Sequence, residues 1–357
     1  QDIESSYRTA PVNPPSRRKM ERYASFADEH GMEMQVSAEE GKSTKWKNNM
    51  IRDDQNRIDV KWNHHVTDFD KAMEKIIAEG KLDPSLGHQA TGLRIFQLDN
   101  GVSKHPRVTG YPGYNMELAK NFFKPETEDM YDDYRGFPQG PGHSTSTAFT
   151  IIGTKGSTDE FDASQPDGSR LSQELNEGLF PYVDFVPVRI SRSVLLTRKT
   201  KKSMFEAVKY AVDNGADIIT LSMAGFGWSY YYYLAAQYAY NRGVLFICAS
   251  GSEVDFISDV MKPASLKRTI GVGGISTRKD SNLFRLIPLP RGNDGKGLDV
   301  SAPARWIYTA GSDKDGHYHR LGIGTSQSAA HVAAAAALWK HYWKDELAHL
   351  ASSYRIV

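Results

Sequence analysis

Three polar residues far apart in the sequence have the side chains that nucleophilic catalysis needs: Asp99, His143 and Ser326. A serine hydroxyl is a weak nucleophile unless a base removes its proton, and the imidazole of histidine is the usual base. A carboxylate bonded to the other ring nitrogen fixes the tautomer of the imidazole and stabilises its charged form. If the fold brings them together, these residues predict acyl transfer through a covalent serine intermediate.

Each of these residues stands where a regular element is expected to begin or end. Residues 93–99 form a short apolar segment that predicts a buried strand ending at Asp99, and His143 heads a segment of small residues that predicts a helix. Ser326 precedes an alanine-rich run, which predicts a helix that other elements can approach closely. A serine at a helix start lies near unpaired N–H groups, which suits a reaction that forms an oxyanion. The plainer alternative is that Thr325 or Ser326 only caps the helix.

Apolar segments alternate with helical segments through the rest of the chain. Strands are expected within residues 178–190, 217–222, 244–249, 269–274 and 298–302, and helices over 203–212 and 229–240. Ser203 and Glu206 have the spacing of a capping box, which places one helix start at residue 203. The alternation predicts the α/β class, with a doubly wound, mostly parallel sheet and helices on both faces. In such a sheet, strand ends and helix starts meet at one edge, where the three polar residues are expected to converge.

The composition limits the classes of function. The 357 residues include 44 Lys plus Arg and 43 Asp plus Glu, so no net charge favours nucleic acid or an anionic membrane. No apolar run is long enough to span a bilayer, and the single cysteine, Cys248, excludes an internal disulfide. Three parts are expected: an irregular polar N-terminal arm over residues 1–60, a catalytic domain over 61–345 and a C-terminal tail over 346–357. The arm is expected to contact the catalytic domain or another chain.

Seven segments resemble, in the same order, segments of the subtilisin-like serine proteases (the subtilase family). They are residues 98–101 with the aspartate, 142–145 with the histidine, 178–189, 221–225, 243–252, 299–303, and 324–333 with the serine. The order aspartate, histidine, serine is one of three known for this arrangement and is that of subtilisin. The resemblance covers about residues 60 to 342. It implies a subtilisin-like fold and a serine endopeptidase in which Asp99, His143 and Ser326 are the catalytic residues.

The resemblance also implies where a peptide binds. An extended peptide would add as a strand along one segment and place the side chain before the scissile bond between that segment and a second one. The residues of the two segments are Ser222, Met223, Ala224 and Gly225, and Ala249, Ser250 and Gly251. Met261 would form the floor of the pocket, so Ala, Val or Leu is expected before the scissile bond rather than Phe or Tyr. Glu253 at the rim would attract basic residues weakly, and Lys262-Pro263 is expected to be a cis peptide bond, as in the family's turn.

The sequence departs from the family pattern at three places. Ser252 stands where the family has the asparagine whose side-chain amide binds the oxyanion, and loss of that donor in subtilisin costs about 10²–10³ in turnover. Its shorter hydroxyl would donate directly, act through a water, or leave the task to another residue. Ser144 replaces the glycine after the histidine, and Ala330 replaces a proline in the serine's helix.

Two alternatives to hydrolysis stay open. In a transpeptidase or macrocyclase, an amine intercepts the acyl-enzyme before water does, and the sequence does not separate this from hydrolysis. In a pseudoprotease, the cleft binds peptide without cleaving it, an interpretation that Ser252 favours and the complete set of three catalytic side chains opposes. No cofactor is expected. Relatives often bind structural calcium, but the acidic loop around Asp159 and Asp167 fits no defined calcium loop. The resemblance favours export from the cell, because many members of the family are exported.

Overall fold

The computed structural model describes residues 58–132, 142–156, 177–252, 259–280, 283–290, 292–311 and 319–354. Most of the expected N-terminal arm, the acidic loop and Glu253 lie outside these residues.

The centre of the molecule is a mostly parallel sheet in the strand order β2-β3-β1-β4-β5-β6-β7, with β8 also paired to β6. In that order the strands are Lys120–Asn121, Asp184–Arg189, Arg94–Asp99, Ile218–Leu221, Leu245–Ala249, Ile270–Asp280 and Leu283–Pro288, with β8 at Val300–Pro303. Only the β6–β7 pair is antiparallel among them. The predicted class is confirmed. Strands β3 and β2 lie on one side of β1, and β4 to β7 follow on the other side, so the order of strands changes direction at β1. In open α/β sheets, ligands bind in the crevice outside such a switch point.

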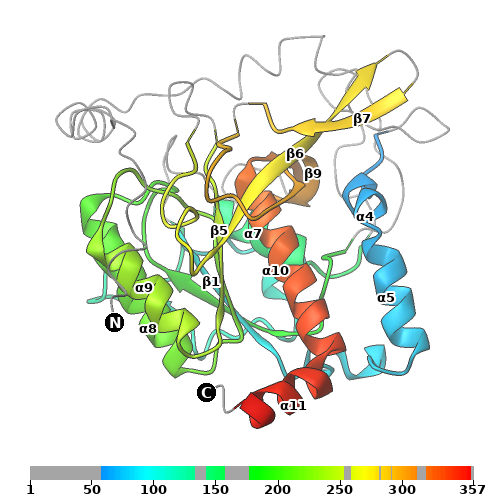
Figure 1. The fold of residues 1–357 in the computed structure, drawn as a ribbon, viewed down its shortest axis with the longest axis horizontal. Helices are drawn as coiled ribbons and strands as arrows, with labels where there is room; N and C mark the ends of the chain where they lie inside the picture. The colour runs from blue at the N-terminus through cyan, green and yellow to red at the C-terminus, as the bar shows by residue number, and fades with distance from the viewer. Residues whose placement is uncertain are drawn as a thin grey trace.

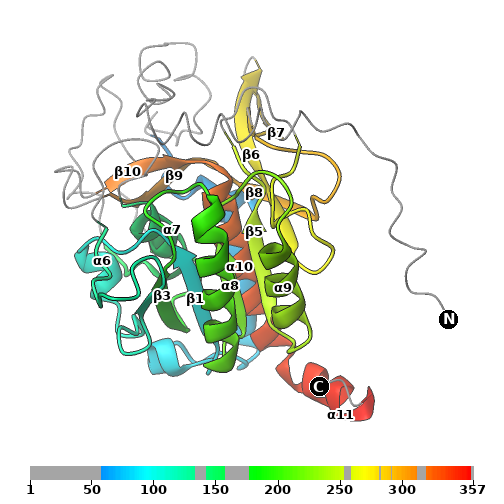
Figure 2. The same cartoon turned by 90° about the vertical axis from the view of Figure 1, so that its left-hand side faces the viewer.

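Helices cover both faces of this sheet (Figure 1). Figure 2 shows α8 (Arg198–Asp213) and α9 (Tyr230–Tyr240) in front of the strands, with α10 (Thr325–Tyr342) behind them. The buried alanines of α10 pack in one hydrophobic cluster with α7 (His143–Ile152), and the apolar faces of α8 and α9 pack in a second. Side chains of a strand alternate between faces, so Ile95 joins the α10 cluster whereas Phe96 and Leu98 join the other. The same alternation turns Asp99 toward α7.

Shorter elements surround this framework. They are α4 (Trp62–Val66), α5 (Phe69–Ala78), a 3-10 helix η2 (Pro84–Gln89), α6 (Pro106–Thr109), the antiparallel pair β9 (Arg305–Ala310) and β10 (His319–Ile323), and α11 (Lys344–Tyr354). Helix α11 covers the first part of the expected C-terminal tail. Among the described residues, no helix combines the length and apolar character needed to cross a membrane.

The helix expected to start at Ser203 starts earlier, at Arg198, so that prediction was wrong. The capping box is formed by Thr197 and Thr200, whose side chains each bond the other's main-chain N–H group.

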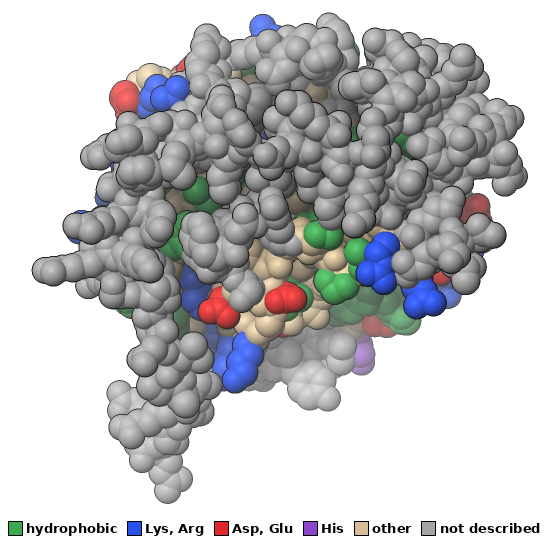
Figure 3. Space-filling view, turned by 90° about the horizontal axis from the view of Figure 1, so that it is seen from above, with side chains coloured by type: hydrophobic (Ala, Val, Ile, Leu, Met, Phe, Trp, Pro, Cys, Tyr) green, Lys and Arg blue, Asp and Glu red, His purple; other side chains and the backbone are tan. Residues whose placement is uncertain are grey.

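The predicted cis peptide bond at Lys262-Pro263 is confirmed. Cys248 lies in β5, fully buried, and burial raises the pKa of its thiol. Figure 3 shows acidic, basic and hydrophobic side chains interspersed among the described residues of one face.

Candidate active site

The carboxylate of Asp99 lies at the carboxyl end of β1, fully buried. The main-chain N–H of Asn100 donates to its Oδ1 atom at 2.8 Å. The Thr147 hydroxyl lies 3.5 Å from Oδ2. These two contacts fix the direction of the carboxylate oxygens.

His143 is the first residue of α7, and Gly142 before it has a left-handed φ of 61° that suits glycine. Through this turn the chain enters the helix directly at the histidine. The N–H of Gly142 donates to Asp132 Oδ2 at 2.8 Å, which anchors the turn. His143 Nδ1 lies 2.8 Å from Asp99 Oδ1 and 3.1 Å from Oδ2. The carboxylate therefore accepts a hydrogen bond from Nδ1–H, and Nε2 is left as the acceptor nitrogen of the imidazole.

Ser326 is the second residue of α10, and its Oγ atom lies 2.9 Å from His143 Nε2. The structure thus brings together three residues separated by 44 and 183 positions into one line of hydrogen bonds. The side chain of His143 is 14% exposed, whereas that of Asp99 is 1% exposed. Such a line can transfer the serine proton to the imidazole while solvent and substrate reach the serine end.

The Ser326 hydroxyl has a second acceptor within reach. Its Oγ atom lies 3.0 Å from the carbonyl oxygen of Ser222, and the Ser222 hydroxyl donates to the Ser326 carbonyl at 3.0 Å. A hydroxyl carries one proton, so Ser326 can donate either to His143 or to Ser222. The reciprocal pair also fixes the start of the 222–225 segment beside the nucleophile.

Two departures from the family pattern are accommodated by the surrounding structure. Ser144 is buried, and its hydroxyl donates to Gln97 Oε1 at 3.1 Å. Gln97 in turn donates to the Ser144 carbonyl at 3.0 Å, so the serine ties α7 to β1 next to His143. Ala330 is fully buried within α10, where an alanine continues the helix without strain.

Ser252 lies beside the first turn of the nucleophile's helix. A Cβ atom placed on Gly324 would lie 3.4 Å from Ser252 Oγ, which puts the hydroxyl next to the residue before α10. The N–H of Gly251 donates to Thr325 Oγ1 at 3.2 Å, and Ser252 pairs with Gly292 in an isolated bridge. The hydroxyl therefore lies close to the start of the helix that carries Ser326.

The expected pocket walls follow the ends of β4 and β5, which are neighbours in the sheet. Met261 is buried, its N–H donates to the Ser250 carbonyl at 2.9 Å, and its sulfur lies close against Gly251. The side chain of Met223 is buried in the cluster under α8 and α9, so within this segment Met223 could line the pocket only through its main chain.

Sequence interpretation missed Asn293, which supports this wall. Its N–H donates to the Gly251 carbonyl at 3.0 Å, and its side-chain amide donates to the Asp259 carbonyl at 2.7 Å. Its own carbonyl accepts the Ser250 hydroxyl at 2.9 Å. The surrounding Gly-Asn-Asp-Gly sequence is a turn signal, and it indicates a loop without indicating what the loop holds.

The strand edge expected to receive a peptide is already paired. The Ala224 carbonyl accepts from the N–H of Leu196 at 2.9 Å, and the Ala224 N–H donates to the Val194 carbonyl at 3.4 Å. On the other edge, Gly225 exchanges two hydrogen bonds with Lys262, at 2.9 and 3.2 Å. Ala224 and Gly225 therefore each have main-chain partners within the chain, on opposite edges of the segment.

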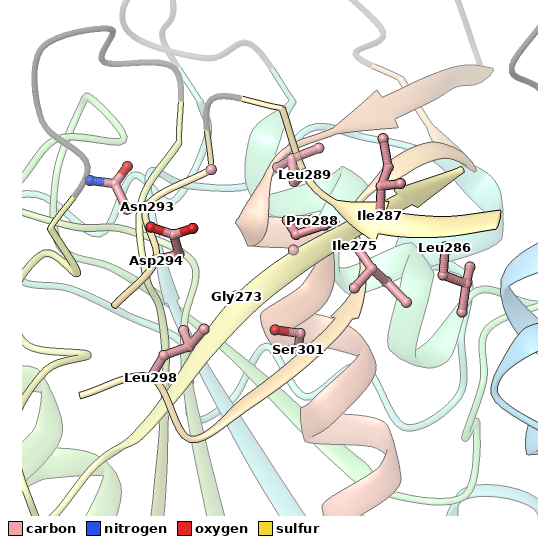
Figure 4. Close-up of a pocket in the computed structure, with 12 residues that line it drawn as sticks. Gly273, Ile275, Leu286, Ile287, Pro288, Leu289, Asn293, Asp294, Leu298 and Ser301 are labelled. Carbon is pink, nitrogen blue, oxygen red and sulfur yellow. The ribbon is translucent and has the colours of Figure 1, made fainter. Parts of the chain in front are cut away.

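A separate hollow of about 230 Å³ lies between β6, β7 and β8. Figure 4 shows Asn293 and Asp294 at one end of it and the apolar side chains of Ile275, Leu286 and Ile287 at the other. Its lining includes Gly292, which pairs with Ser252, and Asn293, which bonds to Gly251.

Within the described part of the chain, no cluster of three or more His, Cys, Asp or Glu side chains could hold a metal ion. The acidic loop considered for calcium lies outside that part.

The chain is similar to known proteins over most of its length. The model of the Subtilase family matches residues 90–351. The major intracellular serine protease of Bacillus subtilis is 26% identical over 270 residues, which is 72% of each chain. Subtilisin BL of Lederbergia lenta is 26% identical over 256 residues, covering 71% of this chain and 78% of that protein.

Solved structures show the same fold. The structure of MycP1 with its N-terminal propeptide removed aligns with a TM-score of 0.53 at 19% identity, covering 80% of this chain and 84% of that one. The prenylagaramide maturation protease PagA aligns with a TM-score of 0.52 at 21% identity, covering 77% and 82%.

Proposed function

The chain belongs to the subtilase family of serine proteases, and from that premise we propose that it cleaves peptide bonds within chains through Asp99, His143 and Ser326. The observation that carries the proposal is a single imidazole with one nitrogen 2.8 Å from a buried carboxylate and the other 2.9 Å from a serine hydroxyl. This is the relation of base, orienting group and nucleophile that acyl transfer requires.

In the proposed reaction, Ser326 Oγ attacks the peptide carbonyl while its proton passes to His143 Nε2. Asp99 holds the imidazole by its Nδ1–H group and stabilises the positive charge. The protonated histidine then donates to the leaving amine, and an ester between Ser326 and the acyl part of the peptide remains. Water, activated by the same histidine, hydrolyses this ester and restores the free serine.

The negative charge on the substrate oxygen needs donors on the opposite side from His143. The main-chain N–H of Ser326 belongs to the first turn of α10, where helical N–H groups have no acceptor inside the helix. We assign the second donor to Ser252, whose hydroxyl lies beside Gly324 at the same helix start. Both donors would act at the positive end of the helix dipole.

A fluorophosphonate probe tests the nucleophile, because it reacts with an activated serine and needs no peptide recognition. We expect the wild type to be labelled and Ser326→Ala not to be, with peptide turnover lowered about 10⁶-fold, the size of effect known for the equivalent loss in subtilisin. Ser328→Ala is a matched control, because Ser328 lies in the same helix and donates to the carbonyls of Ala302 and Pro303 instead. An unlabelled wild type would favour the pseudoprotease alternative.

The masses of the products separate hydrolysis from transfer to an amine. We expect a peptide incubated with an added amine nucleophile to give mainly fragments that have gained water. Amide products as the main species would show a transpeptidase with the same acyl-enzyme.

A further inference from the structure

The edge of the 222–225 segment that faces the nucleophile can be identified from its hydrogen bonds. The carbonyl of Ser222 is directed at Ser326 Oγ. In an extended segment, the N–H and C=O groups of residues two apart point to the same edge. The main-chain groups of Ala224 therefore point to the edge along which a peptide would approach Ser326, and those of Gly225 point away from it.

That edge is filled by the chain itself. Val194 and Leu196 use the N–H and C=O groups of Ala224, and Leu195 pairs with Ala224 in a parallel bridge. A peptide that binds there as a strand needs the same two groups of Ala224. The 194–196 segment and a substrate therefore compete for one position.

Among the described residues, the segment is held by its pairing to Ala224 and by the packing of Leu196. Leu196 is 4% exposed and lies close against Gly225, where a Cβ atom would stand 2.9 Å from the Cβ of Leu196. Val194 and Leu195 are only half-buried, and the Leu195 N–H bonds to the nearby Ser193 hydroxyl. The pairing to Ala224 is an isolated bridge outside the named strands. Apart from the packing of Leu196, displacing the segment breaks two main-chain hydrogen bonds that an incoming peptide can replace.

We propose that residues 194–196 form an internal latch, which occupies the substrate-strand position and must be displaced before a peptide is cleaved. The inference rests on the proposed peptidase function. Because only the fraction of molecules with an open latch binds peptide, the apparent affinity is lowered by that fraction. A small ester or a fluorophosphonate, which needs only Ser326, does not require the opening.

Amide hydrogen exchange in the full chain tests the latch directly. The probe is a peptidyl phosphonate that bonds to Ser326 and extends five residues along the acyl side. We expect the Leu196 amide, protected in the free protein, to exchange at least about tenfold faster in the adduct because it loses its acceptor. The Ala224 amide should stay protected, because the bound peptide replaces Val194 as its acceptor.

Adduct formation with unchanged Leu196 protection would overturn the latch and leave the peptidase function intact. Failure of the small fluorophosphonate to label Ser326 would remove both.

A kinetic experiment gives a second test. Leu196→Ala removes the buried anchor of the latch, and we expect the KM for a ten-residue peptide to fall about tenfold with kcat unchanged. Val208→Ala is the matched control, since Val208 is fully buried in the same cluster but lies in α8. It should leave the KM within about twofold. Equal KM values for Leu196→Ala and the wild type would also overturn the latch. If Leu196→Ala does not fold, the exchange experiment still tests the latch, because it uses the wild-type chain.

Discussion

The proposed catalytic side of the site and its proposed peptide-binding side are built differently. Asp99, His143 and Ser326 stand at the ends of β1, α7 and α10, elements that pack in the core. The peptide-binding side is joined by isolated bridges, such as those of Leu195 with Ala224 and of Ser252 with Gly292. The packing of the core thus fixes the positions of the three side chains. The proposed binding of a peptide depends instead on single main-chain pairings, each of which can be exchanged without the others.

The largest expected effect lies on the catalytic side. Asp99→Asn keeps the size of the side chain but cannot hold the same tautomer of His143, so we expect turnover to fall by about 10⁴. Binding of a peptide inhibitor should change little, because Asp99 does not contact the cleft. Asp184→Asn makes the same change at the start of the neighbouring strand β3, where Asp184 pairs with Arg94. If both variants lose activity equally, the loss does not come from the specific contact of Asp99 with His143.

The second prediction concerns the pH dependence of stability, through His331 on α10. This side chain is buried, Nε2 lies 2.8 Å from the Asn63 amide, and Nδ1 lies 2.7 Å from the Gln327 carbonyl. Burial, above all, lowers its pKa from 6.5 to about 4. The unfolded chain therefore binds a proton between these pH values and the folded chain does not, so folding stability is lost as the pH falls through this range.

The loss should approach about 3 kcal/mol near pH 4 and can be measured by urea unfolding at pH 7, 6, 5 and 4. His331→Gln should flatten that part of the profile, whereas His65→Gln, at an exposed site, should not. A profile that stays equally steep in His331→Gln would show that other groups carry the acid sensitivity.

On the peptide-binding side we expect a smaller effect from Ser252. Ser252→Ala should lower turnover about 10²-fold, and Ser252→Asn should raise it about tenfold, because the amide reaches farther than the hydroxyl. The measurement is kcat on a fixed peptide, with fluorophosphonate labelling as a check that Ser326 is intact. Loss of activity in both variants would mean that the site is built around the hydroxyl.

The smallest effect should come from Met261, which lies against Gly251 at the expected pocket floor. Met261→Gly should raise cleavage after Phe relative to cleavage after Ala by about tenfold, as expected for a few methylene groups of space. A peptide library with one varied position measures the ratio. An unchanged ratio, or a wild type that already cuts chiefly after large aromatics, would remove Met261 from the pocket.

The positions of Asp99, His143 and Ser326 at the ends of regular elements could be predicted because each residue follows a local pattern. Asp99 ends an apolar run, and His143 follows a glycine at the head of small residues. A parallel sheet then brings strand ends and helix starts to one edge. The start of α8 was predicted too late, because the lysine- and arginine-rich first turn is unfavourable near a helix N-terminus and conceals the cap at Thr197.

The peptide-binding side could not be predicted in the same way. The pairing of Leu195 with Ala224 joins a loop to a strand end, and the Val-Leu-Leu sequence has no alternation that would indicate an edge strand. Asn293 likewise acts through its position between Gly251 and Asp259, a three-dimensional relation that local composition does not encode.

Cys248, fully buried in β5, has one further consequence. It is the only thiol of the 357 residues, and burial keeps it protonated and shielded from reagents. A cysteine introduced at an exposed position would therefore react with a maleimide dye while the native thiol stays unmodified. A fluorophore could be attached at a chosen place without removing any native cysteine, and the motion of a surface segment could be followed in real time by its emission.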